Sequence, residues 1–405
     1  MSLVARSCWA LPLACLIAGF PAVARSEGEP AQAPAGDLER ITLGDLGATA
    51  VKPGGGSVRL TLDPTLQRAA QKLLAGAEPV AGALIAIDAH SGRVLAWAEL
   101  ERDGHPRHLL TRARMPAASV FKIVTTAALF ETTSLTPADP VCIAGGMHGI
   151  ERRHLDAPQG GEAIECAPFR YALGYSKNAV YAQLATHRLR RDDLLGTAEA
   201  LGFNGRVPFD GEAEMGRLAL PYNDLEFARA AAGFQGSTLS PLGAAHLANV
   251  IAHGGEATRI RIFEDGRDPD AAAESVARVL HPLTAERIRH MMEVTVRSGT
   301  CRHAFSDEEG RPYLGNIRVA GKTGTLKPGS SEGLTSWFIG FAPSRNPEVV
   351  VSVMLENGKV WRRKANELAR DFLRAYLRKA GRGWLSDPFE REPPKRPSDE
   401  LVSAR

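Results

Sequence analysis

The pattern that most constrains the fold of this chain is a strand-forming region that a long helical stretch divides in two. Apolar runs of strand length, some of them alternating with polar residues, occur on both sides of that stretch. They occupy residues 58–62, 83–87, 93–98, 317–320, 336–341 and 349–355. A hairpin followed by helices favours an antiparallel sheet over a parallel array. We therefore predict one α/β domain whose sheet is split in sequence by a helical lobe.

Helical spacing predicts the remaining elements, and the flanking segments complete the domain map. Helices are expected at residues 65–74, 117–130, 179–187, 241–252, 284–296 and 365–377. Residues 25–56 are rich in Ala, Gly, Pro and Glu without apolar periodicity, which is typical of a linker. Residues 381–405 are expected to be extended or disordered. The folded domain is thus predicted to span residues 57–380.

The first 24 residues have the pattern of an export signal. An uncharged run from Ser7 to Ala24 follows Arg6, and residues 22–24 form an Ala-Val-Ala cleavage site. The run only just reaches the length that spans a bilayer, so cleavage after Ala24 is favoured over retention as a membrane anchor. In either case the body of the chain is exported, and we expect it in the periplasm or elsewhere in the cell envelope.

Charge and cysteine content narrow the function classes further. The formal net charge is +3, from 49 Lys and Arg against 46 Asp and Glu, which does not indicate a nucleic-acid partner. Cys142 and Cys166 flank a loop that contains Gly and His, and in an oxidising compartment we expect them to form a disulfide. Cys301 is left over, and nothing in the sequence assigns it a role.

Three short motifs follow one another in an order that defines a candidate active site. Ser119 and Lys122 form an S-x-x-K motif, residues 176–178 are Ser-Lys-Asn, and residues 322–325 are Lys-Thr-Gly-Thr. Singly each motif is weak, because a chain of this length holds about one S-x-x-K by chance. Together they describe a serine acyl-transfer site that uses lysine in place of histidine.

The S-x-x-K motif has the spacing that activation of a serine requires. Pro116 fits the start of a helix, which places Ser119 in the first turn with Lys122 on the same face. A serine hydroxyl is a poor nucleophile until a neighbouring base takes its proton. Lysine is such a base only if burial or a nearby cation lowers its pKa. The apolar residues around the motif supply the burial, and Lys322 is the candidate for the second cation.

The Lys-Thr-Gly-Thr motif supplies groups for binding a substrate. It follows an apolar run and is expected on a strand, where Lys322 and the hydroxyls meet a substrate carboxylate and Gly324 lets the substrate approach the backbone. The amide of Thr325 would join that of Ser119 as an oxyanion hole. A phosphate-binding loop is disfavoured, because Asn316 stands where such a loop needs glycine.

The Ser-Lys-Asn motif suits a loop that enters a helix. Ser176 is expected to pass a proton between Lys122 and the leaving or attacking amine, and the amide of Asn178 to hold a substrate carbonyl.

With these motifs, the chain resembles the transpeptidase domain of penicillin-binding proteins over about residues 57–380. Further blocks that resemble this family lie at residues 60–67, 82–88, 92–96, 299–300, 320–325 and 337–343. The resemblance implies a fold of the serine β-lactamase/transpeptidase kind: an antiparallel sheet flanked by helices, with an inserted all-helical subdomain and the active site at their junction. Neither a cofactor nor a metal is expected.

The resemblance also assigns roles to the motif residues. It makes Ser119 the acylated nucleophile, Lys122 its base, and Ser176 and Asn178 the proton-relay and substrate-amide residues. Lys322, Thr323 and Thr325 become the carboxylate-binding wall, beside Gly324 as a further substrate-binding position. Two departures stand out. The stretch before Ser57 has no room for a glycosyltransferase or pedestal domain, and Cys301 stands where the family usually has alanine.

The leading functional hypothesis is a peptidoglycan D,D-transpeptidase that acts on D-Ala-D-Ala stem peptides and is acylated by β-lactam antibiotics. Resolution of the acyl-enzyme by water would make it a D,D-carboxypeptidase. A serine β-lactamase would need a base that activates water quickly, and Glu212 and Glu214 lie in a loop without a supporting pattern. A hypothesis of another class is a non-catalytic module that senses β-lactams or muropeptides. The sequence identifies no protein partner.

Overall fold

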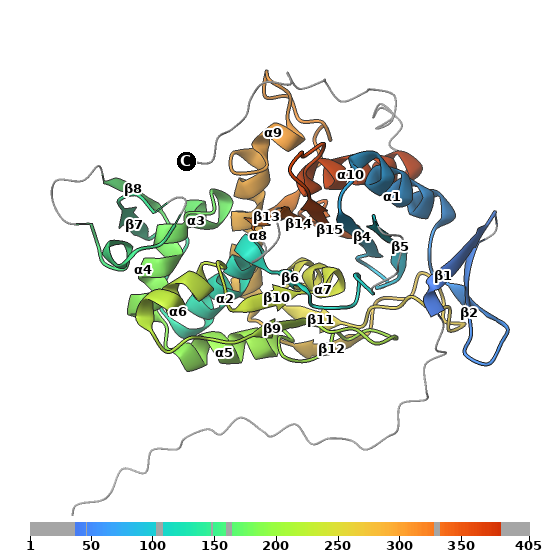
Figure 1. The fold of residues 1–405 in the computed structure, drawn as a ribbon, viewed down its shortest axis with the longest axis horizontal. Coiled ribbons are helices and arrows are strands. Elements are labelled where there is room, and N and C mark those ends of the chain that lie inside the picture. Colours follow the sequence, from blue (N-terminus) through green and yellow to red (C-terminus); the bar gives the residue numbers. More distant parts are fainter. Residues whose placement is uncertain are drawn as a thin grey trace, which may run out of the picture. The chain divides into compact units, whose positions relative to one another are not determined.

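The framework of the domain is a five-stranded antiparallel sheet whose strands come from two distant parts of the chain (Figure 1). The computed structural model describes residues 37–45, 47–102, 108–146, 149–158, 164–327 and 333–381. The sheet has the order β13-β14-β15-β4-β5, with bounds β4 (Ala81–Asp88), β5 (Val94–Glu101), β13 (Ala320–Leu326), β14 (Leu334–Ala342) and β15 (Val349–Asn357). Strand β15 pairs with β4, with Val351 opposite Ala86. The predicted split sheet is therefore confirmed.

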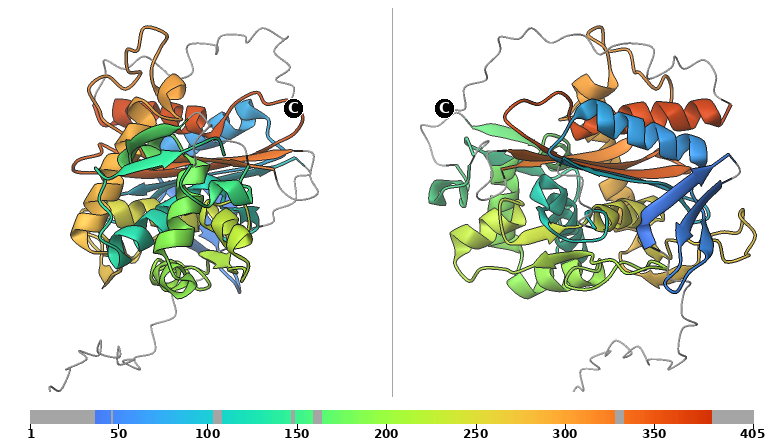
Figure 2. Two further views of the ribbon diagram at one scale, coloured as in Figure 1. Left: turned by 90° about the vertical axis from the view of Figure 1, so that its left-hand side faces the viewer. Right: turned by 45° about the vertical axis from the view of Figure 1, so that its right-hand side comes forward.

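Helices cover both faces of this sheet, as its continuous apolar strands require. Successive side chains of a strand point to opposite faces. Along β4, Leu84 belongs to the core on one face and Ile85 to the core on the other. Helices α1 (Pro64–Ala77) and α10 (Ala365–Lys379) lie on the first face, and α7 (Pro241–Ala252) lies on the second with the helical lobe (Figure 2).

The lobe inserted between β5 and β13 is mainly helical, as predicted. Its helical segments are η1 (Ala118–Phe121), α2 (Lys122–Thr132), η2 (Arg152–His154), α3 (Arg170–Gly174), α4 (Asn178–Arg188), α5 (Arg191–Ala200), α6 (Asp224–Ala231), α7, α8 (Pro282–Arg297) and α9 (Arg302–Phe305), where η marks a 3-10 turn. It is not all-helical. It also contains short strand pairs, which are too brief for apolar alternation to reveal.

These short strands form three small sheets in the described part of the lobe. They are β6 (Met115–Pro116) with β10 (Ser237–Leu239) and β9 (Gly216–Leu218), β7 (Pro140–Ile143) with β8 (Glu165–Pro168), and β11 (Glu256–Thr258) with β12 (Ser275–Arg278).

The linker predicted at residues 25–56 is wrong for its second half. Strands β1 (Asp37–Gly44) and β2 (Gly47–Val51) form a three-stranded antiparallel sheet with β3 (Ser57–Leu60). Ala48 and Ala50 alternate with more exposed residues and are buried in the main core. Alanine is not a typical strand residue, so the alternation of these alanines with other residues does not predict a strand from the sequence.

The predicted export signal at residues 1–24 and the tail after Gly381 lie outside the described residues. Within the described ranges, no helix has the length and apolar character needed to cross a membrane.

Candidate active site

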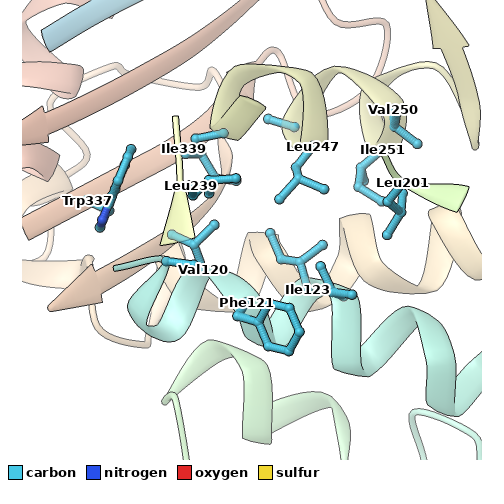
Figure 3. Close-up of a cluster of buried hydrophobic side chains, with 14 of the residues drawn as sticks. Val120, Phe121, Ile123, Leu201, Leu239, Leu247, Val250, Ile251, Trp337 and Ile339 are labelled. Carbon is cyan, nitrogen blue, oxygen red and sulfur yellow. The ribbon is translucent and has the colours of Figure 1, made fainter. Parts of the chain in front are cut away.

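Ser119 lies in the 3-10 turn η1, where the central sheet meets the helical lobe. Ala118 has a φ of 49°, so the helix predicted from residue 117 begins only at Lys122. On the sheet side, Nε1 of Trp337 donates to the carbonyl of Pro116 at 2.9 Å. Val120 packs in a buried apolar cluster with side chains of α7 and β14 (Figure 3). The turn that carries the serine is therefore held against β14 by a hydrogen bond and by apolar packing.

Gly233, just after α6, fits closely against this turn. Its φ is 84°, in the region that favours glycine. A Cβ atom at this position would lie 2.1 Å from the carbonyl oxygen of Ala118. A Cβ on Gly324 of β13 would lie 3.3 Å from the Cβ of Ala118. The two glycines thus allow two segments to approach the turn closely at Ala118, next to the serine.

Lys122, the first residue of α2, contacts Ser119 as the S-x-x-K spacing predicts. Its Nζ lies 2.7 Å from Ser119 Oγ, 2.7 Å from Asn178 Oδ1 and 2.8 Å from the carbonyl oxygen of Ala232. The side chain is completely buried. Burial, and secondarily the nearby ammonium of Lys322, lowers the pKa of Lys122 well below its ordinary value.

The second lysine, Lys322, is also completely buried and lies on strand β13. Its Nζ is 3.1 Å from Ser176 Oγ and 2.8 Å from the carbonyl oxygen of Thr323. Burial lowers the pKa of Lys322 to about 7, against an opposing effect of Cys301. Among the described residues, neither lysine has a carboxylate within ion-pair distance. Two buried amines without counter-ions are expected to lose protons readily.

The strand β13 begins at Ala320, later than the apolar run suggested, and still contains the whole Lys-Thr-Gly-Thr motif. It is the terminal strand in the order of the sheet. The hydroxyl of Thr323 lies 2.6 Å from that of Thr300, and the side chain of Thr325 is exposed. The motif therefore presents hydroxyl groups along a strand whose outer edge pairs with no described strand.

The three motifs meet around one pocket of about 180 Å³. Its walls are Ser119, Asn178, Ala232, Gly233, Phe234, Thr325 and Leu326. Lys122 and Lys322 do not line the pocket themselves. The Nζ of Lys122 contacts the hydroxyl of Ser119, and the Nζ of Lys322 contacts the hydroxyl of Ser176. Residues separated by about 200 positions in the sequence are thus brought together, in an arrangement suited to transfer of an acyl group to and from a serine.

Several residues near this pocket were missed by sequence reasoning. Ala232 contributes a backbone carbonyl, which no side-chain motif can reveal. Gly233 follows a helix and precedes Gly236, and this pair of glycines was the available signal. Tyr181 lies with its ring centroid 5.6 Å from Lys122 Nζ. Thr300 became recognisable only through its contact with Thr323.

The remaining candidates lie away from the pocket. Glu214 accepts hydrogen bonds from the amide of Ala113 at 2.9 Å and from Arg112 at 3.3 Å, and Glu212 pairs with Arg206. Neither carboxylate lines the serine pocket.

The cysteines outside the export signal differ in their surroundings. Cys142 and Cys166, opposite each other on β7 and β8, form a disulfide with an S–S distance of 2.00 Å. Cys301 is buried, its Sγ lies 3.9 Å from Nδ2 of Asn366, and burial raises its pKa to about 12. Such a thiol is unreactive at neutral pH, so we assign Cys301 a role in packing the core and no role in catalysis.

The fold and the pocket together are those of a serine acyl-transfer protein, in which a buried lysine lies 2.7 Å from the serine hydroxyl. Residues 82–377 match the family model described as the penicillin binding protein transpeptidase domain. The chain therefore belongs to the family of penicillin-binding protein transpeptidase domains, as its resemblance predicted.

Relatives in this family include characterised proteins and solved structures. The chain is 27% identical over 361 residues to the peptidoglycan D,D-transpeptidase PbpA of Mycobacterium tuberculosis, which covers 76% of this chain and 68% of the relative. It is similar in fold to the D,D-transpeptidase domain of a peptidoglycan glycosyltransferase from Eggerthella lenta, with a TM-score of 0.65, 23% identity and coverage of 86% and 92% of the two chains. The imipenem acyl-enzyme complex of M. tuberculosis penicillin-binding protein A gives a TM-score of 0.62, 22% identity and 80% coverage of each chain.

Proposed function

We propose that this protein is a peptidoglycan D,D-transpeptidase that forms an acyl-enzyme at Ser119. The observation that carries the proposal is the set of contacts made by Lys122 Nζ. Two of its three contacts, Asn178 Oδ1 and the carbonyl of Ala232, are oxygens that only accept hydrogen bonds. A neutral lysine would donate its two N–H groups to these oxygens. Its lone pair would then face the third contact, the hydroxyl of Ser119.

This geometry suits a defined acylation step. The proton of Ser119 passes to the lone pair of Lys122, and the serine oxygen attacks the carbonyl carbon of the D-Ala-D-Ala amide. The amides of Ser119 and Thr325 are proposed to hold the oxygen that gains negative charge. The Lys322 ammonium with the hydroxyls of Thr323 and Thr325 would bind the terminal carboxylate of the substrate.

Departure of D-Ala requires a proton on its amine. Ser176, within 3.1 Å of Lys322 Nζ, is proposed to give its hydroxyl proton to this amine and to take in its place the proton that Lys122 gained from Ser119. An amine from a neighbouring stem peptide then attacks the ester carbonyl carbon, and the bond between that carbon and the serine oxygen breaks. The proton that the amine loses passes to the serine oxygen and restores its hydroxyl. The amide bond to D-Ala is replaced first by the ester bond to Ser119 and then by an amide bond to the new amine, all at one carbonyl carbon. No net oxidation or reduction takes place.

The environment of the pocket argues for slow hydrolysis of the acyl-enzyme. In the described part of the chain, no carboxylate lines the pocket, and the two glutamates considered as hydrolytic bases are engaged elsewhere. Without a positioned base, water attacks an ester slowly. We therefore favour a transpeptidase over a β-lactamase, and expect β-lactams to remain attached to Ser119.

The proposed site of action is the cell envelope, after export directed by residues 1–24. The disulfide between Cys142 and Cys166 supports this placement, because disulfides persist mainly in oxidising compartments. Stem peptides and β-lactams are the proposed ligands.

The first test is covalent labelling with a fluorescent penicillin, followed over hours, with Ser119→Ala as the control. A label that forms, persists and depends on Ser119 supports the proposal. A label that disappears as the drug is hydrolysed would instead indicate a β-lactamase. A label that survives Ser119→Ala would contradict the assignment of the nucleophile.

A second test separates transpeptidation from hydrolysis. The protein is incubated with a D-Ala-D-Ala pentapeptide, with and without an acceptor amine, and the products are analysed by mass. A cross-linked product that forms only with the acceptor supports a transpeptidase, whereas release of D-Ala by water alone indicates a carboxypeptidase. No release of D-Ala under either condition would reject both activities for this substrate.

A further inference from the structure

Tyr181 is the largest side chain next to Lys122 to which the proposed reaction assigns no part. It is fully buried on α4, and its ring centroid lies 5.6 Å from Lys122 Nζ. Its hydroxyl is 2.7 Å from that of Thr126, and the Thr126 hydroxyl donates to the backbone carbonyl of Lys122 at 2.6 Å. The hydroxyl of Tyr181 therefore donates to Thr126, which fixes the ring against the first turn of α2.

The proposed acylation step creates a cation where the structure supplies no counter-ion. When Lys122 takes the proton of Ser119, its amine becomes an ammonium in a fully buried position. The charged group that acts on it is Lys322 of β13, which repels it. The other groups that face it are Ser119 of η1, Asn178 and Tyr181 of α4, and the carbonyl of Ala232 after α6.

Several charged side chains on the helices packed against α2 are engaged with other groups. These pairs are Asp193 with Arg190 at α5, Arg289 with Glu286 and Glu293 on α8, Arg287 with the ring of Phe130, and Arg170 of α3 with the ring of Tyr171. Among the described residues, the groups in contact with Lys122 Nζ that attract a cation are its hydrogen-bond acceptors and the aromatic ring of Tyr181.

We propose that Tyr181 is a positioning residue whose ring stabilises the protonated form of Lys122 during attack by Ser119. The face of an aromatic ring carries negative potential and attracts an ammonium within about 6 Å. In this step the serine O–H bond breaks, its proton forms an N–H bond on Lys122, and the serine oxygen forms a bond to the substrate carbonyl carbon, whose π electrons move to its oxygen. Tyr181 itself makes and breaks no bond. The inference rests on the proposed function, which makes Lys122 the base.

The proposal predicts two changes when the attraction is removed. The acidic limb of the acylation pH profile reports loss of the proton from Lys122 in the free protein, so its midpoint should move to lower pH by about half a unit to one unit. The rate on the plateau should fall by about three- to tenfold, because the cation is less stable in the transition state. Lys322 titrates in every variant alike, so the difference between variants isolates position 181.

The test measures the second-order rate of acylation of the full chain by a fluorescent penicillin between pH 5 and 10. Tyr181→Phe keeps the ring, whereas phenylalanines with three and five ring fluorines nearly keep its shape but respectively weaken and reverse the negative potential of the ring face. We expect Tyr181→Phe to keep the midpoint of the parent chain, and the fluorinated rings to lower the midpoint stepwise. The ring with five fluorines should lower it furthest, and Tyr181→Leu should lower it less, because leucine neither attracts nor repels the ammonium. The fluorinated series remains informative if the leucine variant fails to fold.

A midpoint that stays constant across the fluorinated series would overturn the proposal, even if the plateau falls, since a ring that only fills space has no effect on the charge of Lys122. Thr126→Val provides the matched control for the hydroxyl contact and should behave like Tyr181→Phe. Failure of the parent chain to be acylated at any pH would overturn the proposed function and this inference with it. An acylated parent with an unmoved midpoint rejects the role of Tyr181 alone.

Discussion

Single residues around Ser119 are constrained mainly by how closely backbone segments approach one another. Gly233 is the clearest case, since a Cβ there would lie 2.1 Å from the carbonyl oxygen of Ala118. We expect Gly233→Ala to displace the serine turn and to lower the rate of penicillin acylation by about 100-fold, which is typical of a displacement of about 1 Å at a reacting group. Stopped-flow acylation measures the effect.

Gly254→Ala is the matched control for this variant. Gly254 also has a positive φ, of 62°, but a Cβ there would meet nothing within 4 Å. The two variants should lose similar stability from backbone strain, while Gly254→Ala keeps its acylation rate. Equal acylation rates would show that the contact with Ala118 does not position the serine.

Lys322 is proposed to serve the reaction, but the burial of its amine lowers the stability of the folded chain. Its pKa in the folded chain is about 7 because of burial, whereas an unfolded lysine titrates at about 10.4. Between these values the unfolded chain binds more protons, so this group makes stability rise with pH. The stability gained by Lys322→Met should therefore be largest below pH 7 and should shrink by about 2 to 3 kcal/mol from pH 6 to pH 9.

Urea unfolding of both chains at the two pH values measures this difference, with Lys52→Met at an exposed position as the baseline. A stability gap between wild type and Lys322→Met that does not change with pH would contradict the assigned burial of the charge.

Some contacts in the site follow from local sequence spacing and could be predicted, whereas others depend on how distant elements pack and could not. Ser119 and Lys122 were predicted to meet because three-residue spacing places side chains on one face of a helical turn. The carbonyl of Ala232 and the ring of Tyr181 were not predicted, because their positions depend on the packing of α6 and α4 against α2. A backbone carbonyl has no residue-type signal at all.

At the scale of elements, the predicted bounds agree best with the structure where residues typical of a helix end are present. The helix predicted at residues 241–252 has the bounds of α7, since Ser240 caps it and Pro241 begins it. Strands such as β9 and β10 have three residues each, too few for a periodicity. The start of α2 was missed because Ala118 adopts a left-handed conformation that alanine seldom takes.

The pair of strands β7 and β8 is an element that we expect to depend on its disulfide. A two-stranded sheet is marginally stable alone, and Cys142 and Cys166 are directly opposite each other in it. The double variant Cys142→Ser and Cys166→Ser should lose about 3 kcal/mol of stability. Its acylation rate should change little, because neither strand contributes to the walls of the serine pocket.

Thermal unfolding with and without reductant measures this contribution. Reductant should lower the Tm of the wild type and leave the double variant unaffected, since Cys301 is buried and has no disulfide partner among the described residues. A Tm of the wild type that is insensitive to full reduction would show that packing alone holds the two strands.

At the scale of the whole molecule, the pairing of β15 with β4 joins strands that are more than 250 residues apart in sequence. The split sheet was nevertheless predictable, because the apolar runs on both sides of the helical lobe are too short and too apolar to be stable without a common partner. The beginning of the domain was not predictable in this way. Its first strands are built largely from small residues, which a hydrophobic pattern does not distinguish from a linker.

The position of this boundary is testable by shortening the chain. A chain that starts at Ser57 keeps the domain expected from sequence, whereas one that starts at Asp37 also keeps β1 and β2. Ala48 and Ala50 are each 1% exposed within the main core, and Ile41 packs against it. Their removal should expose apolar surface and leave β3 without its partner, so the shorter chain should unfold at a Tm lower by about 5 to 10 °C. Its folded fraction should still react with penicillin, because the serine pocket has no wall residue before Ser119. Equal Tm values for the two chains would mean that β1 and β2 are an accessory to the domain, and that the boundary expected from the sequence is the energetically relevant one.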